Sequence, residues 1–271
     1  MELRFTADDF QDEKERGKMK ISIVTVTYNC QELIQKTIQS VIEQNFPNIE
    51  YFIIDGNSTD KTYSIILQYA AENKMISSIS ESDTGIYNAM NKALGYISGD
   101  YVLFLNAGDY LYAKDTLSRF ANYIKAFQEP DIVYGNAVFY LDGQILMTEK
   151  KTFDWKLVLR AHAVCHQSVL AKTTLFQESS FDESYVYCAD REWLYKMYFE
   201  GKKFLHMNER VVYYEASGFS SQKSAQDGIT KEMFRIQKKY CRHYYCLNRI
   251  RRALIKVRDR LLSNCGLMFP A

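Results

Sequence analysis

The 271-residue chain contains only 3 Pro and 12 Gly, so no Pro-rich or Gly-rich stretch marks a flexible linker between domains. No continuous apolar run approaches the ~20 residues of a membrane-spanning helix, and the N-terminus has no apolar signal-peptide stretch. The six cysteines form no Cys-x-x-Cys pair, and we interpret them as reduced thiols. We therefore expect one cytoplasmic domain with appendages.

Charge of one sign is not in excess either. The formal net charge is +1 at pH 7, and the composition is 47% hydrophobic and 25% charged, which is ordinary for a globular protein. Nothing in this balance favours nucleic acid as a partner.

Buried strands and helices alternate along the chain. Runs rich in β-branched and aromatic residues predict strands over 21–27, 51–54, 76–81, 101–105 and 131–140. Apolar residues at helical spacing predict helices over 31–44, 61–72, 86–97, 186–200 and 225–240, with Asn29 as a cap for the first. This order predicts an α/β fold with a mostly parallel central sheet flanked by helices.

Polar residues follow four of these strands. They are Tyr28 and Asn29, Asp55 and Gly56, Asp83, and the segment 106–109. Open parallel sheets bind ligands outside the carboxyl ends of their strands, so we expect a ligand crevice there. For any one position, Asn, Asp and Gly also fit a simple turn.

Four segments carry a family resemblance: VTVTYN at 24–29, IIDGNSTDKT at 53–62, SDTGIYNAMNKAL at 82–94 and GDYVLFLNAGD at 99–109. HQS at 166–168 and CADREWLYKM at 188–197 form a weaker pair. In order and spacing the chain resembles a family 2 glycosyltransferase of the GT-A fold over about residues 19–220. The resemblance extends to bacterial transferases of cell-surface polysaccharide synthesis. It implies transfer of a sugar from a nucleotide-diphosphate donor to an acceptor hydroxyl, with inversion.

The resemblance also implies a donor site. Tyr28 would stack on the base and Asp55 would accept a base N–H. Asp83, Asn91 and Lys92 would line the ribose and pyrophosphate, although Lys92 also fits a solvated helix face. Thr27, Asn29 and Asn106 complete the expected donor-binding residues.

In the family an acidic motif at 106–109 holds a divalent cation, Mn²⁺ or Mg²⁺, on the two phosphates. This chain has Asn106-Ala107-Gly108-Asp109 where the family pattern is roughly Asp-x-Asp-Asp. Asp109 is the remaining acid and the expected metal ligand. The loss of the other acids leaves open a catalytically silent module that binds nucleotide sugars or glycans.

Asp190 matches the family's catalytic base, which takes the proton of the attacking hydroxyl. Glu192 and Asp182 compete for this role. His166 and Gln167 resemble an HQ pair on the acceptor side, and a buried structural histidine is the alternative for His166.

Residues 1–18 are predicted to be a charged extension, 19–224 the transferase domain and 225–271 a helical region. Within the last, residues 247–262 place one apolar stripe among six basic residues and one acid. This segment fits a helix packed on the domain or an interfacial helix on an anionic membrane. An interfacial helix would place the protein peripherally on the inner face of the cell membrane, and it is consistent with a glycan or lipid-linked glycan acceptor.

Overall fold

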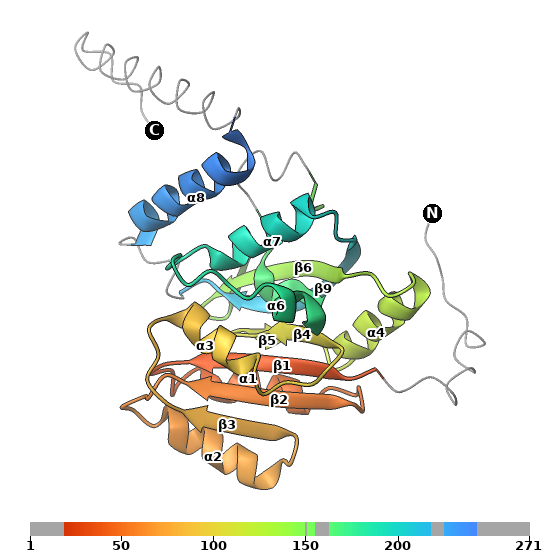
Figure 1. Cartoon of the computed structure of the whole chain (residues 1–271). Helices are drawn as coiled ribbons and strands as arrows, with labels where there is room; N and C mark the ends of the chain where they lie inside the picture. The colour runs from red at the N-terminus through yellow and green to blue at the C-terminus, as the bar shows by residue number, and fades with distance from the viewer. Residues whose placement is uncertain (1–18, 150, 155–162, 218–224, 243–271) are drawn as a thin grey trace.

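The computed structural model describes residues 19–149, 151–154, 163–217 and 225–242. Within these residues nine strands form one sheet, in the order β3-β2-β1-β4-β8-β6-β9-β5, with β7 paired to β6 (Figure 1). The strands are β1 (Ile21–Thr27), β2 (Ile49–Asp55), β3 (Ile76–Ser80), β4 (Tyr101–Phe104), β5 (Tyr110–Leu111), β6 (Ile132–Leu141), β7 (Gln144–Glu149), β8 (Val169–Lys172) and β9 (Phe204–Glu215).

Helices cover both faces of this sheet because both faces of its central strands are apolar. Along β1, Ile21 and Ile23 enter one core, whereas Val24 and Val26 enter the other. The helices are α1 (Ile34–Ile42), α2 (Thr62–Glu72), α3 (Ile86–Ala93), α4 (Thr116–Ala126), η2 (His166–Ser168), α6 (Thr173–Glu178), α7 (Ala189–Phe199) and α8 (Gln226–Tyr240). Buried residues of α1, α2 and α4 share one core, and those of α3, α6, α7 and α8 share the other.

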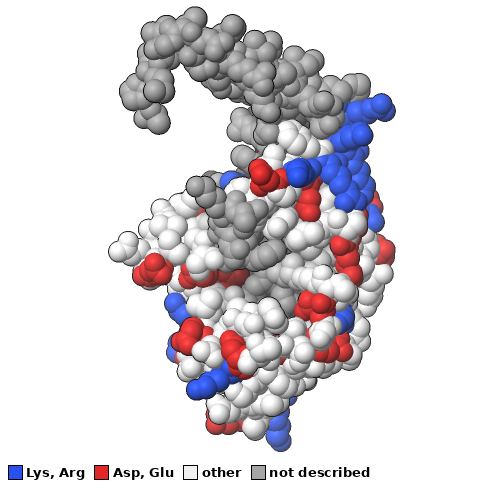
Figure 2. Space-filling view, turned by 90° about the vertical axis from the view of Figure 1, so that its left-hand side faces the viewer, with Lys and Arg blue, Asp and Glu red and all other residues white. Residues whose placement is uncertain are grey.

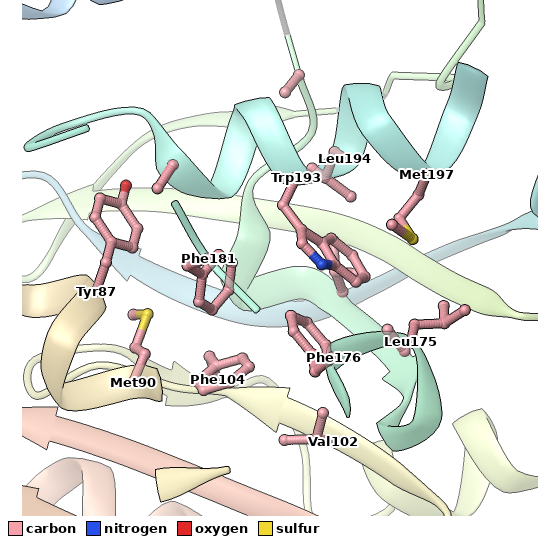
Figure 3. Packing of buried hydrophobic residues seen from close by; sticks show 14 of the residues in the cluster. Tyr87, Met90, Val102, Phe104, Leu175, Phe176, Phe181, Trp193, Leu194 and Met197 are labelled. Carbon is pink, nitrogen blue, oxygen red and sulfur yellow. The ribbon is translucent and has the colours of Figure 1, made fainter. Parts of the chain in front are cut away.

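Aromatic packing fixes α7 on the sheet. Trp193 of α7 stacks on Phe176 of α6 with ring centroids 4.1 Å apart, and Phe176 meets Phe104 of β4 edge to face (Figure 3). Trp193 also donates a hydrogen bond from Nε1 to the carbonyl of Ser179 at 2.7 Å. The N-terminus of α7, which carries Asp190, is thereby held above the carboxyl end of β4.

The predicted α/β architecture is confirmed, with one difference in the sheet. The first four strands pair in parallel, but β8 pairs antiparallel with both β4 and β6, so the sheet is mixed. Sequence reasoning missed β8, β9 and α4. It was also wrong about the cap of α1: Leu33 is the N-cap, and Asn29 adopts a left-handed conformation with φ of 49° four residues earlier.

Two other predictions concern the ends of the chain. The division into an extension, a transferase domain and a helical region remains a prediction, because residues 1–18 and 243–271 lie outside the described part. The basic segment 247–262 lies there too. None of the helices that the structure describes is long and apolar enough to span a bilayer.

Candidate functional site: a cleft at the carboxyl ends of the parallel strands

The carboxyl ends of β1, β2 and β4 lie beside a cleft of about 960 Å³. Figure 2 looks onto this side of the molecule: Asp and Glu side chains surround its centre, and the largest group of Lys and Arg lies at the upper right. The predicted site residues that line the cleft are Thr27, Tyr28, Asn29, Asp83, Asn106, Asp109, His166, Gln167 and Asp190. Most of the predicted site therefore converges on one place.

The end of β1 forms the first wall. The Tyr28 side chain is 59% exposed, so its ring is free to meet a planar ligand. Asn29 is fixed behind it: its Oδ1 accepts the backbone N–H of Thr59 at 2.9 Å, and its own N–H donates to Ser58 Oγ at 2.9 Å. These bonds tie the β1 turn to the turn after β2. They hold Tyr28 at the mouth of the cleft.

Asp55 lies behind this wall. It is fully buried and does not line the cleft formed by the described residues. Its carboxylate accepts hydrogen bonds from the backbone N–H and hydroxyl of Ser58 and from Ser80 Oγ, the last at 2.6 Å. The structure thus shows Asp55 as the organiser of the 55–58 turn.

Asp83 reaches the cleft by passing close to Gly56. A Cβ atom on Gly56 would lie 2.7 Å from Asp83 Oδ2, so any larger residue there would displace this carboxylate. The other oxygen, Oδ1, accepts the N–H of Gly85 at 2.9 Å, just before α3. Asp83 can therefore occupy this position because residue 56, directly after β2, is glycine.

Asn91 and Lys92 do not line the cleft formed by the described residues. Asn91 exchanges hydrogen bonds with the backbone of Phe181 and donates to Glu183 Oε1 at 2.8 Å. Lys92 donates to the carbonyl of Ser82 and pairs with Glu81 at 2.9 Å. Both side chains brace loops that border the cleft.

The segment after β4 places two polar side chains at the floor of the cleft. Asn106 Oδ1 is buried without a hydrogen-bond partner among the described residues, as is Thr27 Oγ1 in the neighbouring turn. Both residues line the cleft. Buried polar atoms are almost always paired in folded proteins, so these two are suited to a polar ligand.

Asp109 is almost fully buried. Burial raises its pKa to about 7, although the N–H of Glu215 donates to its Oδ1 at 2.9 Å. No group of three or more His, Cys, Asp or Glu side chains in the described part of the chain is arranged to hold a metal ion. The charge of His166 and a hydrogen bond from the Gln167 side chain act to lower this pKa but do not offset the burial. A single carboxylate is enough to bind Mg²⁺ that also binds substrate phosphates.

Both carboxylate oxygens of Asp190 have a hydrogen-bond partner. Tyr87 of α3 donates its hydroxyl to Oδ1 at 2.7 Å, and His166 Nδ1 lies 3.1 Å from Oδ2. Figure 3 shows the Tyr87 hydroxyl directed from α3 toward α7. Burial opposes ionisation, but the bond and charge of His166, the charge of Arg191 and the Tyr87 hydroxyl outweigh it and hold the pKa of Asp190 at about 2. Asp190 is therefore ionised at neutral pH.

The two competing acids point elsewhere. Glu192 is buried and accepts hydrogen bonds from Lys239 Nζ at 2.6 Å and from the Tyr240 hydroxyl, both from the α8 region. Asp182 accepts bonds from Ser184 and lies 3.7 Å from Arg235. Neither acid lines the cleft that the described residues form.

Sequence reasoning assigned no role to several residues of the cleft, among them Tyr87, Glu149 and Glu215. Glu149 accepts a bond from the Cys165 N–H at 3.2 Å, and Glu215 is bonded through its N–H to Asp109. Tyr87 could have been found from the sequence, because it lies within SDTGIYNAMNKAL. Glu149 and Glu215 end β7 and β9, where no motif marks them.

Comparison with known proteins identifies the family. Residues 22–200 match the model of glycosyl transferase family 2, so the chain belongs to this family. It is 30% identical over 156 residues to a PGL/p-HBAD biosynthesis glycosyltransferase of Mycobacterium bovis, an alignment that covers 57% of this chain and 60% of that protein. It is 28% identical over 128 residues to the Escherichia coli UDP-Glc:alpha-D-GlcNAc-diphosphoundecaprenol beta-1,3-glucosyltransferase WfaP, covering 47% of this chain and 49% of that one. The chain thus spans about half to 60% of the length of these relatives.

Solved structures agree on the fold. The S. aureus TarS fragment 1–349 in complex with UDP-GlcNAc superposes with a TM-score of 0.65 at 19% identity, over 82% of this chain and 68% of that chain. The mannosyltransferase PcManGT from Pyrobaculum calidifontis, solved with GDP-Man and Mn²⁺, gives a TM-score of 0.65 at 18% identity, over 83% and 65%. The expected GT-A glycosyltransferase fold is confirmed.

Proposed function

We propose that this protein transfers a sugar, with inversion, from a UDP-sugar to a hydroxyl of a glycan or lipid-linked glycan acceptor in surface polysaccharide synthesis. The observation that carries the proposal is the ionised Asp190 in the same cleft as Tyr28, Asp83 and two buried polar atoms that have no hydrogen-bond partner within the described residues. Membership of glycosyl transferase family 2 supports it. So do the UDP-sugar donor and diphosphoundecaprenol acceptor in the name of the E. coli relative.

The donor would bind at the ends of β1, β2 and β4. Stacking of the base on Tyr28 contributes about 1–3 kcal/mol. Thr27 Oγ1 and Asn106 Oδ1 would gain the hydrogen bonds that they lack within the described residues. Asp55 acts on this pocket by fixing the Ser58 turn, to which Asn29 is bonded. Asn91 and Lys92 act by bracing the loops beside it.

A divalent cation, Mn²⁺ or Mg²⁺, would offset the charge that develops on the departing diphosphate. Asp109 is the residue that would hold it, since burial disfavours its ionised form and a nearby cation would offset that cost. We expect Asp109→Ala to abolish the enhancement of UDP affinity by Mn²⁺, as measured by calorimetry with and without the metal. Equal enhancement in the variant and the parent would exclude Asp109 as the metal ligand.

The acceptor would enter beside His166, Gln167 and Asp190. The ionised Asp190 provides the negative charge on which deprotonation of the hydroxyl depends. The basic segment 247–262, outside the described residues, would bring the protein to an anionic membrane where lipid-linked acceptors reside.

Radiolabelled UDP-sugars test the function directly. We expect one donor of a panel to raise the melting temperature, because a ligand that binds only the folded state stabilises it, and to transfer label to an undecaprenyl-diphosphate glycan. Stabilisation without hydrolysis or transfer, in Mn²⁺ and in Mg²⁺, would indicate the silent sugar-nucleotide-binding module instead. A chain that binds none of the panel would exclude both functions.

A further inference from the structure

The cleft is lined by more acidic than basic side chains. Among the described residues that line it, six are acids: Asp83, Asp109, Glu149, Glu183, Asp190 and Glu215. Two are Lys or Arg, namely Lys151 and Arg191. Figure 2 shows acidic side chains around the centre of this side of the molecule. Such a lining repels anions, so an anionic group of a substrate needs a specific cation here.

The two basic residues differ in the partners that they meet. Lys151 Nζ donates to Glu149 Oε2 at 2.8 Å, so its charge is balanced by a neighbouring carboxylate. Arg191 forms no ion pair with a carboxylate among the described residues, and its hydrogen bond there runs from Nη1 to Met233 Sδ at 3.5 Å. A thioether sulfur is a weak acceptor. Arg191 therefore offers a charge that no described acid contacts directly.

Arg191 remains a cation although its side chain is partly buried. Burial opposes the charge, but the negative charge of Asp190 outweighs burial and raises the pKa of Arg191 above its ordinary value. The two carboxylate oxygens of Asp190 nevertheless bond to Tyr87 and His166 rather than to Arg191. Most N–H donors of the guanidinium thus have no partner within the described part of the chain.

The position of Arg191 indicates which substrate would use these donors. Arg191 follows Asp190 in the first turn of α7 and contacts α8 through Met233. The expected donor-binding residues Tyr28 and Asn106 instead follow β1 and β4. In the proposed function Asp190 meets the attacking hydroxyl, so an anion beside Arg191 would belong to the acceptor. A planar guanidinium suits phosphate and carboxylate groups, which it can bind through two parallel hydrogen bonds.

We infer that Arg191 binds an oxyanion of the acceptor, a phosphate or a carboxylate close to the reacting hydroxyl, and thereby selects anionic acceptors over neutral ones. This inference rests on the proposed transferase function and narrows its acceptor class. Arg191 would also offset the repulsion between that anion and Asp190. The oxyanion has two possible sources, the diphosphate that links a glycan to a lipid and the carboxylate of an acidic sugar.

A set of three acceptors tests the inference. All three present the same terminal sugar, which is followed by a diphosphoalkyl group, by a neutral alkyl group or by the alkyl glycoside of a uronic acid. The values of kcat and KM are measured with the donor that the panel identifies. We expect the parent to prefer at least one anionic acceptor over the neutral one by about 10–100-fold in kcat/KM, the value of a charged hydrogen bond. The preferred member identifies the source of the oxyanion.

Arg191→Gln removes the charge and should abolish this preference, chiefly by raising KM for the anionic acceptor. The ratio between anionic and neutral acceptors is the readout, because any effect of Arg191 on Asp190 acts on both acceptors alike. Arg191→Lys keeps the charge without the planar fork and should retain part of the preference. UDP affinity should equal that of the parent in both variants.

Lys151→Gln is the matched control. It makes the same change of charge in the same cleft, but Lys151 is already paired with Glu149, so the preference for the anionic acceptor should persist. The melting temperature of each variant verifies folding. If Arg191→Gln does not fold, Arg191→Lys still tests the inference, since an unchanged preference in it would show that the guanidinium is not the ligand.

Four results would overturn the inference and leave the transferase function in place. They are a parent that uses the neutral acceptor as well as the anionic ones, a full preference in Arg191→Gln, an equal loss of preference in Lys151→Gln, and a folded Arg191→Gln that has lost UDP affinity. The last result would assign the guanidinium to the donor diphosphate. A parent that transfers sugar to none of the acceptors would overturn the proposed function itself.

Discussion

Two carboxylates of the cleft, Asp109 and Asp190, are both buried yet have opposite pKa shifts. Burial raises the pKa of Asp109 to about 7, and the N–H of Glu215, the charge of His166 and the side chain of Gln167 offset this only in part. Asp190 experiences the same desolvation, but His166, Arg191 and Tyr87 lower its pKa to about 2. Divergent environments of this kind separate the tasks of two acids in one site. Asp190 is suited to stabilise positive charge, and Asp109 gains most from a bound cation.

Asp190→Asn tests the first of these tasks. The substitution keeps the shape of the side chain and removes the negative charge on which deprotonation of the hydroxyl depends, so we expect transfer to fall by about 10²–10⁴-fold with UDP affinity nearly unchanged. Glu192→Gln is the matched control, since Glu192 lies two residues away and bonds to Lys239 and Tyr240 outside the cleft. Glu192→Gln should lower the free energy of unfolding and leave the transfer rate nearly unchanged. Parental transfer in Asp190→Asn together with an inactive Glu192→Gln would show that the carboxylates have been assigned in reverse.

Asp109 makes the stability of the free protein depend on pH. Its folded pKa is about 7 against an ordinary value of 3.8, so the folded state binds the proton more tightly than the unfolded state. The contribution of this carboxyl to the free energy of unfolding is therefore fully present below pH 4, and it is lost as the pH rises through 7. Asp109→Asn, which never ionises, should therefore stabilise the free protein at pH 8 by up to about 4 kcal/mol and change little at pH 4. Urea unfolding in EDTA at the two pH values measures this difference, and equal effects at both would contradict it.

At the scale of elements, the turns after the parallel strands depend on one another. The β1 turn is bonded to the β2 turn through Asn29 and Ser58, and the β2 turn carries Gly56, against which Asp83 packs. Farther along the edge, α3 reaches α7 through Tyr87 and Asp190. The walls of the cleft are therefore built from contacts between elements, and we expect a change in one turn to propagate to its neighbour.

Gly56→Ala tests this dependence. The added Cβ would lie 2.7 Å from Asp83 Oδ2, so we expect the carboxylate to move and UDP-sugar affinity to fall by about tenfold or more, the value of one charged hydrogen bond. Gly95→Ala is the control, because its Cβ would meet only the carbonyl of Lys92 at an ordinary 3.5 Å. Calorimetry with the donor provides the measurement. Equal affinities in both variants would show that Asp83 does not depend on Gly56.

At the scale of the whole molecule, α8, the last helix that the structure describes, is part of the core that also contains α7. Met233 and Ile236 of α8 pack with Trp193 and Leu194 of α7, and Glu232 accepts the backbone N–H groups of residues 186–188. Residues up to 242 therefore support the position of Asp190. The basic segment at 247–262 begins only a few residues later in the sequence.

Deletion of residues 247–271 should separate membrane binding from donor binding. It removes six basic residues and the apolar stripe of 247–262 but retains α8. We expect the truncated protein to lose its affinity for vesicles rich in anionic lipid and to keep the UDP affinity and melting temperature of the parent. Co-sedimentation with anionic and neutral vesicles measures the first property. Unchanged sedimentation, or loss of folding, would indicate a helix packed on the domain.

The sequence by itself determined the α/β class, the four parallel strands β1 to β4 and the position of most cleft residues. Buried parallel strands are runs of β-branched residues, and local turn residues must follow them, so both signals are local in the chain. Asp55, Asn91 and Lys92 do not line the cleft of the described residues, and their roles in donor binding remain predictions. Their place in a motif was visible, but which side chain faces the cleft depends on hydrogen bonds to Ser80, Phe181 and Ser82 elsewhere in the chain.

Only the tertiary structure decided which of three neighbouring acids lines the cleft. Asp182, Asp190 and Glu192 are equivalent by charge and lie within one short segment. What separates them is the neighbour that each meets: Arg235 for Asp182, Lys239 and Tyr240 for Glu192, and His166 and Tyr87 for Asp190. These partners come from up to 103 residues away. A side chain's ionisation and orientation depend on the charges and dipoles packed around it, and these are assembled only when the chain folds.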